Sequence, residues 1–321
     1  MLVDMKIGDL LQYQGRNPKP QDFDAFWDQS LADLAALDPQ CEWIPAAFQT
    51  AEAECFDLYF TGMGGSRIHA KFARPRDAAR RKGPAVVFYH GYSGNAGDWI
   101  QLLPYVCSGF SIASMDCRGQ GGKSQDTIPT TGTTFHGQII RGLDDTPDKF
   151  VFRNIYLDAV ELVRIVGNEP YVDASRIGVT GGSQGGGLTL AAASLAPEIN
   201  RAASIYPFLS DYKRVWEMDL AQGAYQELKD YFRRHDPRHE REDAIWEKLG
   251  YIDIQHLAPR IRGSVKMFTG MMDTTCPPST QFAAYNKITA PKSYVLYPDF
   301  GHEALPEAAD MILQFMLEMM D

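Results

Sequence analysis

The fold is most clearly marked by the segment Arg176-Ile-Gly-Val-Thr-Gly-Gly-Ser-Gln-Gly-Gly-Gly-Leu-Thr-Leu190, which predicts a short buried strand, a tight turn and the start of a helix. The turn contains the pattern Gly-x-Ser-x-Gly with Ser183 at its centre. Small residues on both sides of a serine permit the strained backbone that lifts its hydroxyl out of a strand-to-helix turn. A phosphate-binding loop is the competing interpretation, but the Gly-x-Gly-x-x-Gly spacing after a first strand and the lysine of a P-loop are absent. The segment therefore predicts a serine nucleophile at the carboxyl end of a strand.

Short apolar runs on both sides of this segment predict further strands. Each run ends in glycine or polar residues, and most are followed by a helical segment such as residues 154–166. The predicted strands cover residues 85–89, 111–115, 176–180, 202–206, 265–269 and 293–297. Two alternating runs at 55–60 and 67–73 predict an antiparallel pair ahead of them. The pattern favours an α/β fold with a mostly parallel central sheet flanked by helices.

The whole chain, residues 1–321, is predicted to form a single domain with three additions. Residues 1–54 contain an amphipathic helix with an aromatic face, so we expect an N-terminal extension that docks on the domain. Residues 123–151 lack apolar periodicity and are interpreted as an interface-like insertion. Residues 211–256 are charged and helix-prone, which predicts a helical cap-like insertion over one end of the sheet.

Composition and charge exclude several classes of protein. The 321 residues are 45% hydrophobic, which is enough for a large core without disulfides or metal. Lys and Arg number 31 against 41 Asp and Glu, giving a net charge of −10, and no basic block is longer than Arg80-Arg81-Lys82, which is expected in a solvated loop. Nucleic acid and membrane partners are therefore not expected. Five cysteines without metal-type spacing, acidic residues at the N-terminus and no run of about 18 apolar residues favour a cytoplasmic protein with reduced, mostly buried thiols.

A serine nucleophile needs a histidine base, which follows it in chain order in the α/β-hydrolase fold. Four histidines lie downstream of Ser183. His235 and His239 belong to a charged run typical of solvated surface, and His256 lies within the predicted cap. His302 lies just after the last predicted strand and before a C-terminal helix expected from about Glu303. This position predicts His302 as the base.

The base in turn needs a carboxylate that holds its tautomer. Asp273 follows the predicted strand at 265–269 and precedes a tight turn with two prolines, so it is the favoured acid. Asp211 follows the preceding strand and remains the rival. Asp299 is too close to His302 in sequence to reach its Nδ1 easily.

The negative oxygen that forms during acyl transfer needs two backbone donors. The amide of Gln184, directly after the serine, is the first predicted donor. The second is the amide of Tyr92, in the loop His90-Gly-Tyr-Ser-Gly94 after the predicted strand at 85–89. His90 itself is expected to be a structural hydrogen-bonding residue rather than a catalyst.

With these residues placed, the chain resembles the acetyl xylan esterase and cephalosporin C deacetylase family, carbohydrate esterase family 7, within the α/β-hydrolase superfamily. The resemblance covers nearly the whole length, and Arg118-Gly-Gln-Gly-Gly122 is its most distinctive motif. The other motifs are Asn17-Pro-Lys-Pro20 with Asp22-Phe-Asp-Ala-Phe-Trp27, His90-Gly-Tyr92, Arg141-Gly-Leu-Asp-Asp145, Tyr156-Leu-Asp-Ala-Val160, Gly181-Gly-Ser-Gln-Gly-Gly186, Asp273-Thr-Thr-Cys-Pro-Pro-Ser-Thr280 and Gly301-His-Glu303.

The resemblance implies an esterase that removes acetyl groups from small substrates such as acetylated xylo-oligosaccharides and cephalosporin C-like esters. It implies Ser183, Asp273 and His302 as the triad, with the amides of Tyr92 and Gln184 holding the oxyanion. It also implies that Arg118, Gly119 and Gln120 brace the site from behind, together with Glu303. From the residues alone, Arg118 also fits a structural ion pair, and Glu303 fits the N-terminus of the expected helix.

Family members form a ring-shaped hexamer, so the resemblance further implies a homohexamer with residues 123–151 at an interface. No cofactor or metal ion is expected. Three other activities remain open from the sequence: a longer-acyl esterase or peptidase of the same superfamily, an acyltransferase that passes the acyl group to another alcohol, and a catalytically silent binding protein.

Overall fold

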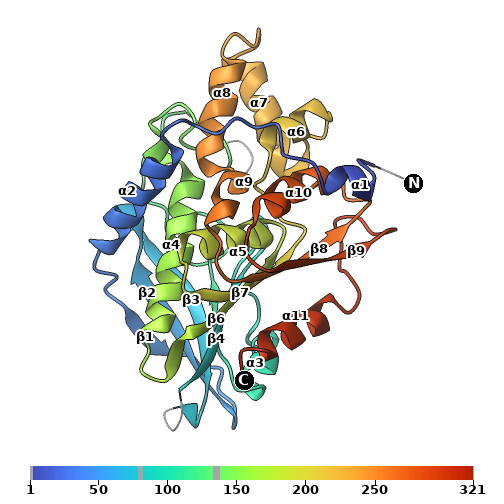
Figure 1. Ribbon diagram of the computed structural model, residues 1–321. Helices are drawn as coiled ribbons and strands as arrows, with labels where there is room; N and C mark the ends of the chain where they lie inside the picture. The colour runs from blue at the N-terminus through green and yellow to red at the C-terminus, as the bar shows by residue number, and fades with distance from the viewer. Residues whose placement is uncertain (1–2, 79–81, 133–137, 321) are drawn as a thin grey trace.

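A single sheet runs through the computed structural model, which describes residues 3–78, 82–132 and 138–320 (Figure 1). Within these residues nine strands pair in the order β1-β2-β3-β5-β4-β6-β7-β8-β9. The strands are β1 (Glu42–Pro45), β2 (Ala53–Thr61), β3 (Arg67–Pro75), β4 (Gly83–Tyr89), β5 (Ser111–Met115), β6 (Val172–Gly182), β7 (Ile199–Ile205), β8 (Ser264–Gly270) and β9 (Lys292–Tyr297).

Two types of pairing divide the sheet. The strands from β1 to β3 are antiparallel to their neighbours, and β3 pairs antiparallel with β5. From β5 to β9 all pairs are parallel, with β4 at the centre, where Val87 faces Ala113 on one side and Val179 on the other. The carboxyl ends of the parallel strands therefore lie along one edge, where α/β proteins place their sites.

Helices cover both faces of the sheet. The helices of the described residues are α1 (Ile7–Leu10), α2 (Phe23–Ala35), α3 (Leu103–Cys107), α4 (Val151–Gly167), α5 (Gln184–Leu195), α6 (Tyr212–Glu217), α7 (Gln226–His235), α8 (Glu242–Leu249), α9 (Ile254–Leu257), α10 (Pro278–Lys287) and α11 (Ala308–Leu317). The main core lies between the sheet and the helices α2, α4 and α5, and a second core is formed with α3 and α11 on the opposite face (Figure 1). This arrangement confirms the predicted α/β-hydrolase fold.

The six predicted strands of the mostly parallel sheet and the antiparallel pair are all present, and the helix predicted at 154–166 is α4. The edge strand β1 was not predicted, because its four residues are mostly exposed and end in Pro45. The C-terminal helix was predicted to start at about Glu303, and this prediction is wrong, since α11 begins at Ala308. Pro306 disfavours helical backbone in the residue before it, and Glu307 has a φ of 62°.

The N-terminal extension contacts the segment predicted as a cap. Asp211 accepts hydrogen bonds from the amides of Arg16 and Asn17 at 2.8 Å and from the hydroxyl of Tyr13 at 2.8 Å. Within residues 211–256, α6, α7 and α8 lie together at the top of Figure 1, beyond the sheet. Contacts among Trp216, Phe232 and Trp246, with ring centroids 4.8 to 6.0 Å apart, pack these three helices on one another.

Some sequence predictions concern residues outside the described part. Arg80 and Arg81 of the basic block, and residues 133–137 of the insertion, are among these.

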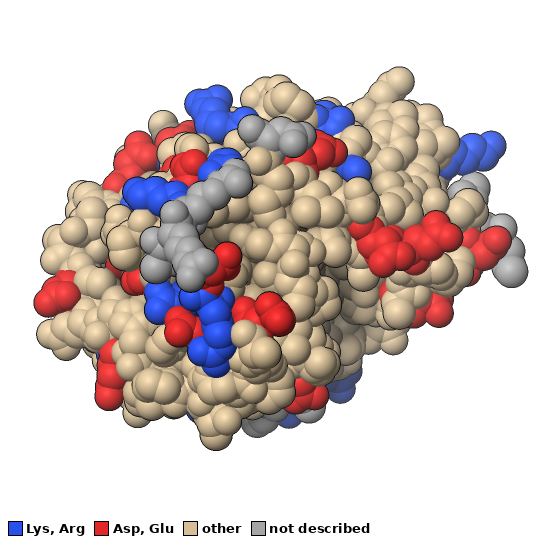
Figure 2. Space-filling model, turned by 90° about the horizontal axis from the view of Figure 1, so that it is seen from below, with Lys and Arg blue, Asp and Glu red and all other residues tan. Residues whose placement is uncertain are grey.

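On the face shown in Figure 2, basic and acidic side chains lie interspersed. None of the helices in the described ranges has both the length and the apolar character that crossing a bilayer requires.

Candidate active site

Ser183 occupies the sharp turn between β6 and α5. Its backbone has φ 58° and ψ −118°, a left-handed φ that L-residues rarely adopt, and its amide donates to Ile205 O at 3.0 Å. The neighbouring glycines are required by space, because a Cβ on Gly181 or Gly185 would lie 2.4 or 2.0 Å from Tyr89 O. The elbow predicted from the sequence is therefore present, with Ser183 directly before the first residue of α5.

The structure brings the three residues of the predicted triad together. His302 Nε2 lies 2.9 Å from Ser183 Oγ, and His302 Nδ1 lies 2.8 Å from Asp273 Oδ2. Asp273 is fully buried, and its second oxygen, Oδ1, accepts hydrogen bonds from the amides of Thr275 and Cys276 at 2.8 Å. Because a carboxylate accepts only, the proton on the imidazole lies at Nδ1, which leaves Nε2 free to accept from the serine.

The rival residues lie elsewhere. Asp211 is buried under the N-terminal extension, and its amide donates to Asp253 Oδ2 at 2.9 Å. His256 bonds Pro18 O at 3.1 Å, and burial lowers the pKa of its imidazole to about 3. His239 pairs with Glu242 at 2.9 Å on the exposed side of the cap. The geometry therefore selects Asp273 and His302 from the candidates.

The amides of Tyr92 and Gln184, the two predicted oxyanion donors, are left without an acceptor among the described residues. One side chain joins the two loops that carry them: Gln120 Oε1 accepts from Ser93 N at 2.9 Å, and the amide groups of Gln120 and Gln184 bond each other at 2.9 and 3.1 Å. Gln120 thus holds the neighbour of one donor and the side chain of the other, which fits the bracing role implied for it.

Arg118 and Gly119 support the site from further away. Arg118 is fully buried and makes a bidentate ion pair with Asp158 of α4, with both distances 2.7 Å, and it also donates to Met63 O at 3.1 Å. This pair fixes the start of the loop that carries Gln120. Gly119 has a φ of 64°, which favours glycine, and lets that loop turn.

Glu303 was interpreted as a possible residue of a helix N-terminus, and this interpretation is wrong because the helix begins later. Its carboxylate instead accepts from Gly301 N at 2.9 Å and closes the turn that presents His302. The bracing role implied for Glu303 therefore has a different physical basis.

His90 is held in one tautomer by its surroundings. The amide of Cys117 donates to His90 Nε2 at 3.0 Å, so the ring proton lies on Nδ1 and is donated to Gly91 O at 2.6 Å. Burial lowers the pKa of this imidazole, which keeps it neutral. His90 is a structural residue of the loop 90–94, as expected.

Sequence reasoning missed several neighbours of the triad. The ring of Tyr206 lies 4.5 Å from that of His302, and Phe208 donates its amide to Ser183 O at 3.0 Å. The thiol of Cys276 is buried beside Asp273, and burial raises its pKa well above the usual value, so it stays protonated. The available signal was position: Tyr206 and Phe208 directly follow the strand next to that of the nucleophile.

Metal binding at this site has one candidate set. Asp273, Cys276 and His302 are the only group of described residues whose potential ligand atoms lie within 4.8 Å of one another. In this set Asp273 bonds His302, and His302 bonds Ser183. This hydrogen-bond relay explains why the carboxylate and the imidazole lie close together.

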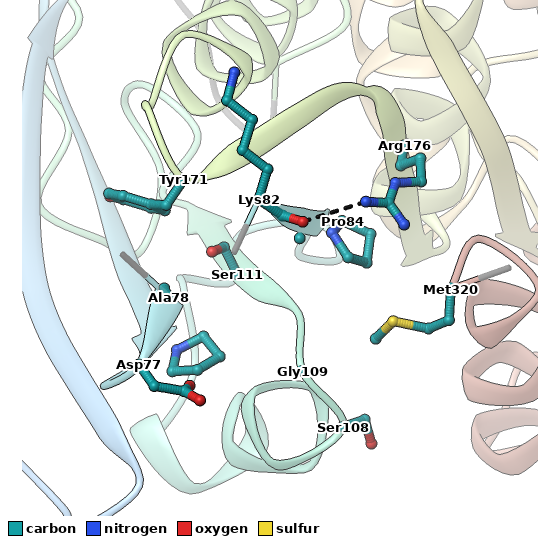
Figure 3. A pocket seen from close by; sticks show the side chains of 12 residues that line it. Asp77, Ala78, Lys82, Pro84, Ser108, Gly109, Ser111, Tyr171, Arg176 and Met320 are labelled. Carbon is teal, nitrogen blue, oxygen red and sulfur yellow. Dashed lines mark hydrogen bonds between the residues drawn. The ribbon is translucent and has the colours of Figure 1, made fainter. Parts of the chain in front are cut away.

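A cavity of about 390 Å³ lies away from the triad (Figure 3). It is lined by Lys82, Ser111, Tyr171 and Arg176, among others, near the amino ends of β4, β5 and β6, where Arg176 donates to Lys82 O at 3.3 Å. Ser183 lies at the opposite, carboxyl end of β6. None of the predicted site residues lines this cavity, so cavity size does not locate the chemistry here.

Comparisons with known proteins agree with this geometry. A family model for acetyl xylan esterases (AXE1) matches residues 1–319. The acetyl esterase Axe7A of Xylanibacter ruminicola is 28% identical over 309 residues, which cover 93% of this chain and 67% of that protein. The structure of acetyl xylan esterase 1 from Thermoanaerobacterium sp. JW/SL YS485 has 53% identity and a TM-score of 0.97, covering 99% of this chain and 100% of its own. That of the acetyl xylan esterase from Paenibacillus sp. R4 has 35% identity and a TM-score of 0.93, covering 98% and 99%.

Proposed function

Because the chain belongs to the acetyl xylan esterase family, and is thus a carboxylic ester hydrolase that removes acetyl groups, we propose that it does so through an acetyl-enzyme on Ser183. The observation that carries this proposal is the relay from Ser183 Oγ to His302 at 2.9 Å and from His302 to Asp273 at 2.8 Å. The peptidase, acyltransferase and silent-binding alternatives have no comparable support.

The first half-reaction forms the acetyl-enzyme. His302 Nε2 takes the proton of Ser183 Oγ while the oxygen attacks the acetyl carbonyl carbon, and the carbonyl oxygen becomes negative between the amides of Tyr92 and Gln184. The carbon–oxygen bond to the sugar then breaks, and His302 returns the proton to the leaving alcohol. Asp273 stabilises the imidazolium throughout.

The second half-reaction restores the serine. Water gives one proton to His302 Nε2 as its oxygen attacks the acetyl carbon, and the same two amides hold the second oxyanion. Collapse breaks the bond between the acetyl carbon and Ser183 Oγ, His302 returns the proton to Ser183 Oγ, and the product leaves as acetic acid, which loses its remaining proton to the solvent. Both proton transfers at Ser183 pass through His302.

For the substrate, we propose small acetylated sugars, such as acetylated xylo-oligosaccharides, and acetyl esters of the cephalosporin C type. Aromatic side chains lie next to the relay: the ring of Tyr206 lies 4.5 Å from that of His302, and Phe208, whose amide donates to Ser183 O, contacts Tyr92 at 5.8 Å. Aromatic rings offer apolar faces to a sugar, and rigid rings beside the relay favour a short acyl group. A series of esters that varies acyl length at constant alcohol tests this, and equal rates for acetyl and octanoyl esters would refute the acetyl preference.

The role of Ser183 is tested by Ser183→Ala, with Ser175→Ala, at an exposed position near the amino end of β6, as the control. The first variant should lose at least about 10⁴-fold in kcat on a chromogenic acetyl ester, and the control should retain full activity. A fluorophosphonate probe should label the wild type and the control but not Ser183→Ala. Full activity of Ser183→Ala would exclude the covalent mechanism.

Assembly and location are also proposals. We propose a homohexamer, because the described part of residues 123–151 is tied to the rest of the molecule by ion pairs such as Arg118–Asp126, at 3.6 Å, and so forms a fixed surface. Light scattering in solution tests the hexamer. The five cysteines form no disulfide in the structure, which supports a reducing, cytoplasmic location.

A further inference from the structure

A buried carboxyl group lies near Tyr92 of the loop 90–94, which is called the oxyanion loop below because its Tyr92 amide is a proposed oxyanion donor. Glu227, the second residue of α7 in the cap, has no exposed surface. Its Oε1 accepts hydrogen bonds from the amides of Gln138, at 2.9 Å, and Ile139, both in the insertion. Its other oxygen, Oε2, is buried and has no hydrogen-bond partner among the described residues. Buried carboxyl oxygens are nearly always paired, so this atom needs an explanation.

Tyr92 approaches the same place from the oxyanion loop. Its hydroxyl is buried and also has no hydrogen-bond partner within the described residues. Burial and the nearby Glu227 carboxyl raise the pKa of this phenol far above its usual value. The Tyr92 ring contacts Phe208 at 5.8 Å, and Phe208 contacts Tyr225 of the cap at 4.5 Å. Cap, insertion and oxyanion loop therefore meet around Glu227.

The charge of Glu227 depends on a small set of neighbours. Burial raises the pKa of its carboxyl to about 8, against the opposing effect of the amides of residues 138–140 and of Arg141. Arg141 compensates little, because its guanidinium is bound to Gln138 Oε1 at 2.7 Å and to Asp126. From the oxyanion loop, Tyr92 faces Glu227 as a neutral phenol. At neutral pH the carboxyl is therefore mostly protonated, and the proton belongs on Oε2, since Oε1 already accepts two N–H groups.

We propose that Glu227 is a positioning residue for the oxyanion loop and that its neutral form is the active one. The neutral carboxyl accepts hydrogen bonds from the amides of Gln138 and Ile139 in the insertion, and it places no charge between the cap and Tyr92. Ionisation puts a negative charge behind the loop whose amide must stabilise a negative oxygen, and like charges in a buried site oppose each other strongly. This inference rests on the proposed function, because it takes the Tyr92 amide as an oxyanion donor.

A purely structural role predicts something different. A buried acid that only holds α7 against residues 138 and 139 affects unfolding but leaves the shape of the pH–rate profile unchanged. The positioning role predicts a fall in kcat as the carboxyl ionises, with little change in KM, because the oxyanion exists only in the transition state.

The test measures kcat and KM from pH 6 to 9.5 for the wild type, Glu227→Gln and the control Glu240→Gln, an exposed cap residue. An acid with a pKa of about 8 is about 90% protonated at pH 7 and about 10% at pH 9, so wild-type kcat should fall about tenfold over this range. Glu227→Gln keeps the acceptor oxygen without a charge, so its kcat should stay within about threefold across the range. Glu240→Gln should follow the wild type.

Three outcomes overturn the proposal. The wild-type kcat does not fall between pH 7 and 9, or the Glu227→Gln profile keeps the wild-type fall. In the third, Glu227→Gln folds and loses the same fraction of wild-type kcat at every pH. If Glu227→Gln does not fold, the wild-type profile still decides, together with the rate of fluorophosphonate labelling, which should fall over the same pH range. A failure of the proposed function would abolish labelling of Ser183 by the probe at pH 7. Labelling at pH 7 therefore separates that failure from a failure of the Glu227 proposal.

Discussion

Replacement of Asp273 by asparagine tests the relay with almost no change in side-chain volume. Oδ1 of Asp273 accepts from the amides of Thr275 and Cys276, and Oδ2 accepts from His302 Nδ1, all at 2.8 Å. In the Asp273→Asn variant the amide oxygen must stay on the two N–H groups, because an NH2 group there would face two donors. The NH2 group then faces His302 and holds the imidazole proton on Nε2, where it cannot accept from Ser183.

This wrong tautomer sets the size of the effect. When the third residue of a triad keeps its position but stabilises the wrong imidazole tautomer, kcat falls about 10⁴-fold, which corresponds to about 5 kcal/mol in the activation barrier. Stability should change far less, because the buried amide keeps its two backbone donors, and a loss of about 1 to 3 kcal/mol in the free energy of unfolding is expected. Initial rates on a chromogenic acetyl ester and urea unfolding measure the two effects separately.

Asp211→Asn provides the matched control, because Asp211 was the rival acid. It is equally buried, but its oxygens accept from Tyr13, Arg16 and Asn17 in the N-terminal extension. Its replacement should leave kcat within about threefold and lower the free energy of unfolding by about 1 kcal/mol. The assignment is refuted if Asp273→Asn keeps more than a tenth of wild-type kcat, or if Asp211→Asn loses as much activity.

Two further variants test the surroundings of the serine. Gln120→Ala removes the hydrogen bonds to Gln184 and to the amide of Ser93. The kcat should therefore fall about 10-fold to 100-fold, with KM changed by less than about threefold. Unchanged steady-state kinetics would show that the Gln120 side chain does not hold the two loops. Gly185→Ala places a Cβ 2.0 Å from a backbone oxygen and should give little soluble, active protein, whereas Gly8→Ala meets nothing within 4 Å and should match the wild type in yield and activity.

Much of the fold could be predicted because buried strands and the serine turn leave strong local patterns. The runs at 85–89 and 176–180 are apolar because both faces of β4 and β6 are covered. The predicted start of the C-terminal helix was wrong because Pro306 disfavours helical backbone before it and Glu307 has a positive φ, so α11 begins only at Ala308. The short strand β1 has no alternation to detect, since it only adds an edge to β2.

The acid of the relay shows where local patterns stop. Asp211 and Asp273 both follow strands whose carboxyl ends lie at the same edge of the sheet, so sequence position favours one without excluding the other. What separates them is packing: the N-terminal extension binds Asp211, while the turn at 273–276 points Asp273 towards His302. Tyr206 and Glu227 were missed because contacts across loops and the cap leave no periodic signal.

The loop 90–94, which we propose carries an oxyanion donor, is held by contacts from distant parts of the chain. Donors for a developing negative charge act well only if they are fixed before the charge appears. The loop 90–94 has few bonds of its own, such as Gly94 N to Gly91 O at 3.0 Å. It is held instead by Gln120 on one side and, through Phe208, by the cap on the other. In the proposed mechanism, a cap that fixes this loop contributes to the chemical step, so changes in the packing of the cap against Phe208 should reduce kcat before they raise KM.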